Sequence, residues 1–334
     1  MNNFFSTSGP RRLLVSLVAI TALTAVGCSS GSDSADTNKP AEKSTTTAAA
    51  NQSTTAPAKD VLKILVSNDD GYNAPGIDAV VRALVAMPDT EVVVSAPATQ
   101  QSGKGSKVTD GELKSSEQKT LSGHAVFAVE GTPADSVNWA LDGGVDMKPD
   151  LVITGINSGQ NLGSIADQIS GTVGAARAAT SRGIPALATS MGSDSETNVN
   201  EVINVDAFET AAKFVADWVG EHRDGLLEGK YKGDTPLLEN MNIPICAVGQ
   251  PRGVAQVELA QTNDSTQLHP QDCQSTLAQP ADDITAFNNG FVTISSVPLV
   301  SSRRLTASSD LTIRVTHDRS SQLAAMWRRL RGRG

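Results

Sequence analysis

The sequence contains few aromatic residues, few cysteines and no excess of positive charge. Phe, Trp and Tyr make up 4% of its 334 residues, three residues are cysteine, and the formal net charge is -9 at pH 7. Proteins whose main partner is a nucleic-acid polymer usually present a strongly basic surface, so we do not expect that partner. The histidines and cysteines show no zinc-ligand spacing, and the phosphate-loop pattern GxxxxGK(S/T) is absent. The sequence therefore argues against nucleic-acid binding, a zinc centre and a P-loop.

The first residues of the chain have the pattern of a secretory signal peptide. Arg11 and Arg12 precede an apolar run over 13–26, which is too short to span a bilayer comfortably. Cys28 follows in the place where a lipoprotein signal carries its lipidated cysteine. We expect residues 1–27 to be a signal peptide and the exported protein to be anchored to a membrane of the cell envelope through Cys28. The alternative is an ordinary signal peptide followed by an incidental cysteine.

A long polar segment separates this signal from the rest of the chain. Residues 29–59 contain no Leu, Ile, Val or aromatic residue and cannot bury enough apolar surface to offset the entropy of ordering. We therefore expect a disordered tether over 28–60, followed by one folded region over 61–320. The basic end, 321–334, is expected to be a frayed tail.

Apolar runs and helical patterns alternate over the first part of the folded region. The apolar runs lie at 63–66, 91–94, 126–129, 151–154 and 184–189. Helical spacing follows the first run over 77–85, Thr132 and Pro133 can start a helix that reaches 141, and a further helix is expected over 172–182. Strands that are apolar on both faces and alternate with helices indicate a mainly parallel sheet covered on both sides. The sequence predicts an α/β fold with a doubly wound, Rossmann-like core over 61–200.

The pattern changes after a helical segment at 206–222. Strands are expected at 237–244, 254–259 and 291–295, with no clear helices between them. We expect a smaller β-rich extension over 237–300, which could serve oligomer contacts. In an exported protein Cys246 and Cys273 could form a disulfide, although two cysteines alone leave the pairing open.

Polar residues suited to one hard cation follow the first, second and fourth apolar runs. Asp69 and Asp70 offer carboxylates. Ser102 offers a hydroxyl, and Asn157 an amide oxygen. Ligands of open parallel sheets bind beyond the carboxyl ends of the strands, and all-oxygen ligand sets suit Mg²⁺, Mn²⁺ or Ca²⁺. Taken singly, Asp70-Gly71 could be an ordinary turn and Asn157 a loop residue, so the prediction rests on their meeting at one edge of the sheet.

A second group of residues is typical of an anion site. Ser170, Gly171 and Thr172 stand just before a helix, where free backbone N–H groups and the helix dipole attract phosphate. The glycine-rich loop that contains Gly103 and Lys104 could bring further N–H groups and one cation to the same phosphate. An ordinary helix N-cap at Ser170 is the alternative.

At these residues the chain resembles the SurE family, the stationary-phase survival proteins that act as metal-dependent 5′/3′-nucleotidases. The matching strings are SNDDGYNAPGI from Ser67, VVVSAPATQQSGKG from Val92, GTPADSVNWAL from Gly131, PDLVITGINSGQNLG from Pro149, SGTVGAARAA from Ser170, GIPALATS from Gly183, NMNIP from Asn240 and DITAFNNGFVTIS from Asp283. Several long motifs in one order are far more specific than any single one of them.

The resemblance implies a site for one divalent cation and a phosphate beside it. The implied cation ligands are Asp69, Asp70, Ser102 and Asn157. The implied phosphate contacts are Asn68, Asn161, Ser170, Gly171 and Thr172. The family further implies a β extension that exchanges elements between subunits, which gives homodimers or homotetramers. Ile169 departs from the family pattern, which usually has Tyr before Ser-Gly-Thr.

The leading hypothesis is metal-assisted hydrolysis of nucleoside 5′- or 3′-monophosphates, with Mg²⁺ or Mn²⁺ activating the attacking water. Because no histidine lies in the motifs, Asp69 or Asp70 is expected to accept the proton, and a covalent phosphate on Asp69 ranks lower. The alternatives are an exopolyphosphatase and a non-catalytic envelope lipoprotein that binds a nucleotide or phosphate. The sequence separates neither the possible phosphate esters nor the two metals.

Overall fold

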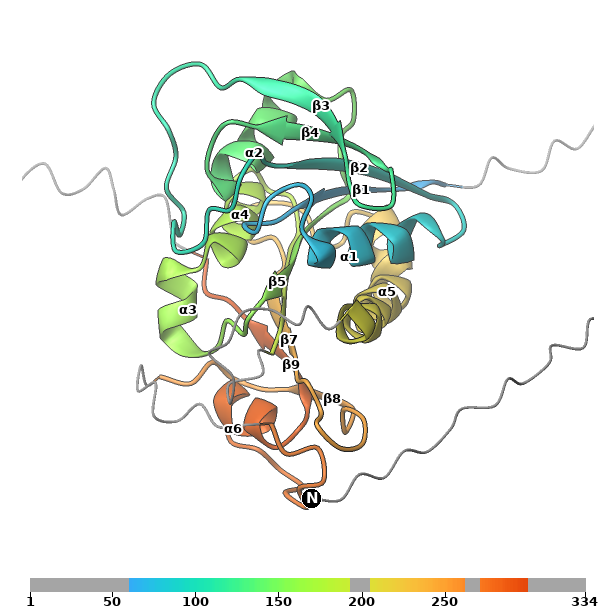
Figure 1. The fold of residues 1–334 in the computed structure, drawn as a ribbon, viewed down its shortest axis with the longest axis vertical. Coiled ribbons are helices and arrows are strands. Elements are labelled where there is room, and N and C mark those ends of the chain that lie inside the picture. The colour runs from blue at the N-terminus through green and yellow to red at the C-terminus, as the bar shows by residue number, and fades with distance from the viewer. Residues whose placement is uncertain (1–59, 193–204, 262–270, 300–334) are drawn as a thin grey trace, which may run out of the picture. The chain divides into compact units, whose positions relative to one another are not determined.

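The computed structural model describes residues 60–192, 205–261 and 271–299 (Figure 1). The expected signal peptide, Cys28, the tether and the basic tail lie outside these residues. Within the described ranges, no helix combines the length and the apolar character needed to cross a membrane.

A single nine-stranded sheet forms the centre of the fold, in the order β3-β4-β2-β1-β5-β6-β7-β9-β8 (Figure 1). Its parallel part consists of β4 (Ala125–Val129), β2 (Thr90–Pro97), β1 (Leu62–Ser67), β5 (Leu151–Ser158), β6 (Ala186–Met191) and β7 (Leu238–Ile243). The remaining strands are β3 (Ser115–Lys119), which is antiparallel to β4, β9 (Val292–Ser296), which is antiparallel to β7, and β8 (Val254–Gln256), which is parallel to β9. The predicted α/β fold with a mainly parallel sheet is confirmed.

Helices cover both faces of the sheet. The helices are α1 (Pro75–Val85), α2 (Pro133–Trp139) with a π-helical turn over Ala140–Gly144, α3 (Gly163–Ile169), α4 (Gly171–Thr180), α5 (Val205–Leu227) and α6 (Asp283–Asn288). Along β1, Leu62 and Ile64 belong to the core that includes α1 and α5, whereas Leu65 belongs to the core that includes α2 and α4. Because side chains alternate across a strand, these two cores lie on opposite faces, and β1 is apolar on both of them.

Two features of the C-terminal region differ from the expectation. A helix, α6, lies between β8 and β9, where no helix was expected. This helix has six residues, too few for a helical period to be read, and the Asp282 side chain caps it by accepting from the Thr285 N–H at 2.7 Å. The strands expected in the extension also continue the main sheet, since β7 pairs with β6, and β9 with β7.

Two further elements were not expected at all. All five residues of β3 are exposed, so the strand has no apolar alternation that could reveal it. Helix α3, which follows β5 and leads into α4, was also missed. The expected strand at 254–259 is shorter in the structure, because only Val254–Gln256 pair with β9.

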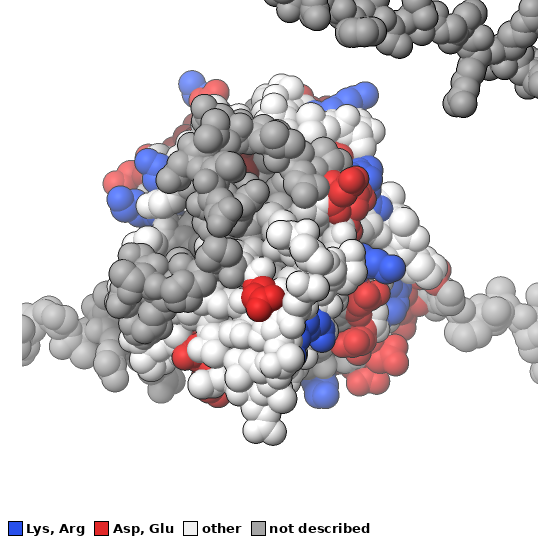
Figure 2. Space-filling view, turned by 60° about the horizontal axis from the view of Figure 1, so that its bottom comes forward, with Lys and Arg blue, Asp and Glu red and all other residues white. Residues whose placement is uncertain are grey.

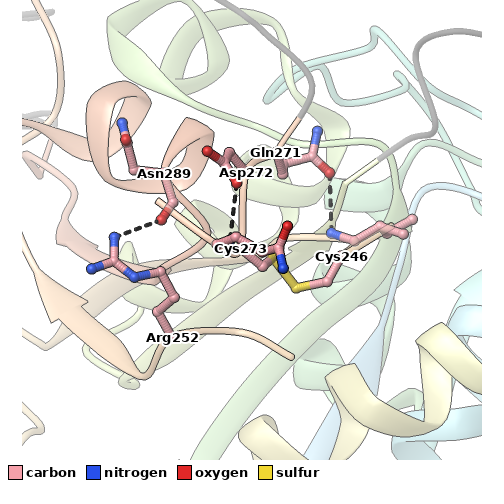
Figure 3. Close-up of a disulfide and its surroundings, with 8 residues drawn as sticks. Cys246, Arg252, Gln271, Asp272, Cys273 and Asn289 are labelled. Atoms are coloured by element: carbon pink, nitrogen blue, oxygen red, sulfur yellow. Dashed lines mark hydrogen bonds between the residues drawn. A yellow bond between two sulfur atoms is a disulfide. The ribbon is translucent and has the colours of Figure 1, made fainter. Parts of the chain in front are cut away.

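Cys246 and Cys273, whose pairing the sequence left open, form a disulfide with a Cα–Cα distance of 5.6 Å (Figure 3). Hydrogen bonds support the same junction. Gln271 Oε1 accepts from the Ile245 N–H at 3.1 Å, and the Asp272 N–H donates to the Asn288 carbonyl at 2.8 Å. The disulfide therefore joins the end of β7 to the segment that precedes α6.

Loss of this disulfide should destabilise the protein. A bridge across a sequence separation of 27 restricts the unfolded chain, and its removal is expected to lower the free energy of unfolding by about 3 kcal/mol. Urea unfolding of the Cys246→Ser/Cys273→Ser double variant measures this, with the oxidised wild-type protein beside it. An unchanged unfolding midpoint would show that the bridge is not formed in solution.

Figure 2 brings forward the face at the bottom of Figure 1, where α6 and β8 lie. The middle of this view shows few charged side chains, and acidic and basic residues lie to its right and at its upper left. Large apolar side chains exposed in the C-terminal region include Val248 and Val254, at 59% and 53%.

Candidate active site

The sheet has a topological switch point between β1 and β5. From β1 the chain moves outward through β2 to β4, and it then returns to the other side of β1 to form β5, β6 and β7. In open α/β sheets the crevice beyond the carboxyl ends of two such strands is the usual ligand site. The segment after β1 contains Asp69 and Asp70, and β5 ends in Asn157 and Ser158. The Ser158 N–H donates to Asp70 Oδ2 at 3.0 Å, so the ends of the two strands are in direct contact.

Asp69 is the point on which three segments converge. Its side chain is 3% exposed, and its Oδ1 accepts from Thr172 Oγ1, at the start of α4, at 2.6 Å. Its backbone carbonyl accepts from the Gln101 N–H, in the loop after β2, at 2.7 Å. A Cβ atom added to Gly171 would lie 2.8 Å from both Cβ and Oδ2 of Asp69, so only glycine fits there. The turn after β1, the loop after β2 and the start of α4 therefore share one small space.

The start of α4 has the geometry expected of an anion site. Ser170 is the N-cap, and its Oγ accepts from the Val173 N–H at 3.2 Å. Thr154 Oγ1, on β5, donates a hydrogen bond to the Thr172 carbonyl at 2.8 Å and so holds the helix start against the sheet. The N–H groups at the start of this helix and the positive end of its dipole thus lie beside Asp69. The structure places Thr172 in contact with Asp69, and Ser170 and Gly171 directly before it in the chain.

The loop after β2 carries two of the predicted residues, Ser102 and Gly103, both of which are exposed. Ser102 Oγ accepts from Gln100 Nε2 at 2.6 Å, and no bond joins it to either aspartate. Gly103 has a φ of 74°, and a Cβ there would meet open space. The structure therefore places Ser102 one residue beyond the Gln101–Asp69 contact, and its role as a cation ligand stays a prediction.

The same loop is packed tightly against the anion site. The Gly105 N–H donates to the Ile169 carbonyl at 3.1 Å, and Gly105 has a φ of 56°. A Cβ atom added to Gly174, in the first turns of α4, would lie 2.1 Å from the Gly105 carbonyl oxygen. Ile169, which departs from the family pattern, is 57% exposed at this junction. The contact between α4 and the loop after β2 therefore fixes the positions of both segments beside Asp69.

Asn157 lies at the end of β5, beyond a register shift that separates it from Thr154 in the pairing with β6. Its side chain is buried, and its Nδ2 donates to the Gly159 carbonyl at 2.6 Å. This bond uses the amide nitrogen and leaves the amide oxygen available as an acceptor. The arrangement fits the predicted role of Asn157 as an oxygen ligand.

Asn161 reaches the anion site from the loop after β5. Its Nδ2 donates to Ser190 Oγ at 2.8 Å and lies 3.5 Å from Thr172 Oγ1. Its backbone is held by β7, since its N–H donates to Asn242 Oδ1 at 2.7 Å and its carbonyl accepts from Asn240 Nδ2 at 2.7 Å. The structure therefore brings Asn161 to the site, and β7 fixes its position.

The next residues of this loop are held by a buried carboxylate of α6. Asp283 is fully buried, and its Oδ2 accepts from the Gly163 N–H at 2.7 Å. Its Oδ1 accepts from the N–H groups of Ala260 and Ile284, at 2.8 and 2.9 Å. Sequence reasoning assigned no role to Asp283, Asn240 or Asn242, although all three lie in motifs that carried the family resemblance.

Asn68 was predicted to contact the phosphate, but its hydrogen bonds in the structure are to its own turn. Its side chain is fully buried, with Nδ2 donating to the Gly71 carbonyl at 2.8 Å and Oδ1 accepting from the Gly71 N–H at 3.2 Å. These two bonds close the turn that presents Asp69 and Asp70. Its contact with phosphate stays a prediction.

The two aspartates form an electrostatically unfavourable pair. Burial raises the pKa of Asp69 above its usual value, against the opposing effect of the hydrogen bond from Thr172. Burial, together with the charge of Asp69, raises the pKa of Asp70 to about 6, although the Ser158 N–H lowers it in part. Among the described residues no group of three or more His, Cys, Asp or Glu side chains could hold a metal. A cation here would need the neutral oxygens of Asn157 and Ser102 beside the two carboxylates.

This pair should make the stability of the cation-free protein depend on pH. Because the folded-state pKa of Asp70, about 6, lies above its ordinary value of 3.8, folding favours its protonated form. The free energy of unfolding should therefore fall, on the order of 2 kcal/mol, as the pH rises from 4 to 7. Urea unfolding in EDTA measures this, and the fall should be smaller in Asp70→Asn. Equal pH dependence in the two proteins would contradict the account.

Comparison with known proteins places this site in a family. The family model described as "Survival protein SurE" matches residues 64–266. The chain belongs to the SurE family. This range includes every predicted cation and phosphate residue, from Asn68 to Thr172.

Two curated relatives of this SurE family member are both named "5'-nucleotidase SurE". The protein of Methanocella arvoryzae is 40% identical over 189 residues, which are 54% of this chain and 66% of the relative. The protein of Methanothermobacter thermautotrophicus is 47% identical over 131 residues, which are 39% of this chain and 49% of the relative. The chain thus spans about two thirds and about half of the length of these relatives.

A solved structure supports the same relationship at the level of the fold. The crystal structure of the SurE protein from Aquifex aeolicus superposes with a TM-score of 0.54 and 28% identity. The match covers 74% of this chain and 98% of the other. The fold described above is therefore the fold of a SurE protein.

Proposed function

We propose that this SurE family member is a metal-dependent phosphomonoesterase that hydrolyses nucleoside 5′- or 3′-monophosphates. The observation that carries the proposal is the position of Asp69 and Asp70 beside the start of α4, where Thr172 Oγ1 binds Asp69 at 2.6 Å. Two carboxylates with raised pKa values favour a cation, and the adjacent helix start favours an anion. A site with both preferences suits a phosphate ester bound through a cation. The names of the two curated relatives agree with this class of substrate.

The donor set fits Mg²⁺ or Mn²⁺. Asp69, Asp70 and Asn157, with Ser102 as the fourth group, would hold the ion through oxygen atoms alone, as both ions prefer. When bound, such an ion would neutralise phosphate charge and lower the pKa of a water molecule. Binding would also offset the burial that raises the pKa of both carboxylates and the charge of Asp69 that further raises the pKa of Asp70.

The protein's own residues would bind the phosphate and accept the proton. The N–H groups at the start of α4, with Asn161 Nδ2 near Thr172, would bind the phosphate oxygens as charge develops on them. Asp70 is the less buried of the two aspartates, so it is the better placed to accept a proton and pass it to solvent. Asn240, Asn242 and Asp283 would hold the loop of Asn161 in place.

The enzyme is further proposed to be exported and attached to a membrane of the cell envelope by a lipid on Cys28, with 28–60 as its tether. The signal pattern over 1–27 supports this. Incorporation of labelled palmitate in cells that express the protein tests the anchor, and Cys28→Ser should abolish it. Equal labelling of both proteins would exclude Cys28 as the lipidated residue.

We also propose a homodimer or homotetramer, which light scattering of the purified protein would measure.

Release of phosphate from a panel of esters tests the proposed activity. The purified protein should hydrolyse 5′-AMP or 3′-AMP with Mg²⁺ or Mn²⁺ and should lose this activity in EDTA. Polyphosphate belongs in the panel, because a preference for it would favour the exopolyphosphatase alternative. Binding of AMP without turnover under every metal would favour the non-catalytic binding protein and contradict the proposal.

A further inference from the structure

A second cavity, of about 500 Å³, lies beside the candidate active site on the same edge of the sheet. It is formed where β2 and β4 end, between the loop after β2 and the residues that precede α2. Its lining consists of Ala98, Thr99, Gln101, Lys104, Lys107, Val108, Thr109, Val129, Glu130, Gly131 and Thr132. Of its lining residues only Lys104 has a predicted role in the active site, as a cation that could reach the phosphate.

The loop after β2 forms the wall between the cavity and the site. Gln101 lines the cavity, and its N–H donates to the Asp69 carbonyl at 2.7 Å. Thr99 also lines the cavity, and its backbone carbon would lie 3.3 Å from a Cβ atom added to Gly71. Only this loop therefore separates the cavity from Asp69 and Asp70, and a molecule bound at both would pass over the loop.

The cavity carries two lysines that have no acidic partner. Neither Lys104 nor Lys107 forms an ion pair with any residue of the described chain. Glu130 is the one acidic residue in the lining, so the lining has a net charge of +1 from two lysines and one glutamate. In a protein with a net charge of -9, two unpaired lysines at a cavity are a local attraction for an anion.

Of the three hydroxyl groups of the lining, Thr99 accepts from Gln101 Nε2 at 3.1 Å, and the other two donate within the protein. Thr109 Oγ1 donates to Asp135 Oδ2 at 2.6 Å, and Thr132 Oγ1 donates to the Lys107 carbonyl at 2.6 Å. The second of these bonds fixes the backbone of Lys107 against the start of α2. The lysine ammonium groups are thus the principal free donors for a ligand.

Part of the lining is apolar. Val108 is 60% exposed, and Ala98, directly after β2, is half-buried, whereas Val129 at the end of β4 is fully buried and lies behind the surface. Apolar surface next to free ammonium groups suits a ligand that combines a ring with an anionic group.

We propose that this cavity binds the second, non-reacting phosphate of a nucleoside bisphosphate, while the first phosphate is hydrolysed at Asp69 and Asp70. The sugar and base would lie against the apolar part of the lining. In the reaction a water oxygen bonds to phosphorus, the ester P–O bond breaks, and the leaving hydroxyl takes a proton, which gives a nucleoside monophosphate and orthophosphate. The proposal rests on the proposed function and deepens it by naming a substrate class.

Lys107→Gln tests the proposal with adenosine 3′,5′-bisphosphate, 5′-AMP and 3′-AMP as substrates. Lys107 is chosen because Lys104 belongs to the glycine-rich loop that is predicted to reach the active-site phosphate. Loss of one charge-assisted contact should raise the KM for the bisphosphate about tenfold and change the KM for either monophosphate less than about twofold. Lys107→Arg, which keeps the charge, should restore most of the affinity.

Lys119→Gln is the matched control, because it removes one exposed lysine charge from β3, outside the cavity. It should leave all three KM values unchanged. An unchanged KM for the bisphosphate in Lys107→Gln, or an equal rise for all three substrates, would overturn the proposal. If the wild-type protein hydrolyses none of them, the proposed function fails. The cavity is then tested by calorimetry with adenosine 3′,5′-bisphosphate. Lys107→Gln should weaken its binding about tenfold. Equal binding to the two proteins would exclude the cavity as the phosphate site.

Discussion

Replacement of Asp70 with Asn is expected to lower kcat for phosphate release on the order of a thousandfold, without loss of the fold. The substitution keeps the shape of the side chain and can keep the hydrogen bond from the Ser158 N–H, which now reaches Oδ2 at 3.0 Å. It removes the charge that would attract the cation and the group proposed to accept the proton. Colorimetric measurement of phosphate release from 5′-AMP with Mn²⁺ gives the rate, and far-UV circular dichroism reports on the fold.

Asp142→Asn is a matched control for this experiment. It makes the same chemical change in an exposed carboxylate, whose ion pair is with Arg182 at 2.9 Å and not with a site residue. Its activity should stay within about twofold of the wild type, since an exposed ion pair contributes little to stability. A similar loss in both variants, or wild-type turnover in Asp70→Asn, would contradict the role given to Asp70.

The second large effect is expected from Gly174→Ala. The new Cβ atom would lie 2.1 Å from the Gly105 carbonyl oxygen and 2.7 Å from the Ser106 nitrogen, so α4 and the loop after β2 must move apart. We expect a loss of roughly 2 to 3 kcal/mol in the free energy of unfolding from this overpacking. Displacement of the anion site from Asp69 should also lower kcat/KM by roughly a hundredfold.

Gly220→Ala tests whether these losses come from the close contact and not from the change of residue type. Gly220 also lies within a helix, α5, but a Cβ atom there would meet no atom within 4 Å. Alanine should therefore stabilise this helix by roughly 0.5 to 1 kcal/mol and leave activity unchanged. Urea unfolding and AMP hydrolysis measure both variants. If Gly174→Ala behaves like Gly220→Ala, the loop is not docked on α4 in solution.

The sheet and its main helices could be predicted because their signals are local. Thr132 and Pro133 mark the start of α2, and the structure contains the full capping box, with the Thr132 N–H donating to Asp135 Oδ2 at 2.8 Å. The apolar run that became β1 is buried on both faces, as a central parallel strand requires. The helix start at Ser170 to Thr172 was predicted as an anion site, whereas its contact with Asp69 became visible only in the structure.

The supports of the site could not be predicted, because they connect distant parts of the chain. Asn240 binds the carbonyl of Asn161 across 79 residues, and Asp283 binds the Gly163 N–H across 120 residues. No periodicity or spacing identifies such pairs, although the motifs that contain them were recognised. The cavity at Lys107 was missed for a similar reason, since its walls come from the ends of two strands that only the sheet order places side by side.

Isothermal titration calorimetry of the purified protein with Mn²⁺ tests the central claim most directly. The claim is that oxygen atoms from the ends of β1 and β5 and from the loop after β2 hold one divalent cation. The wild-type protein should bind one Mn²⁺ per chain at pH 7.5, and Asp70→Asn should bind it at least about tenfold more weakly. Equal binding to the two proteins, or no binding to the wild type, would contradict the account.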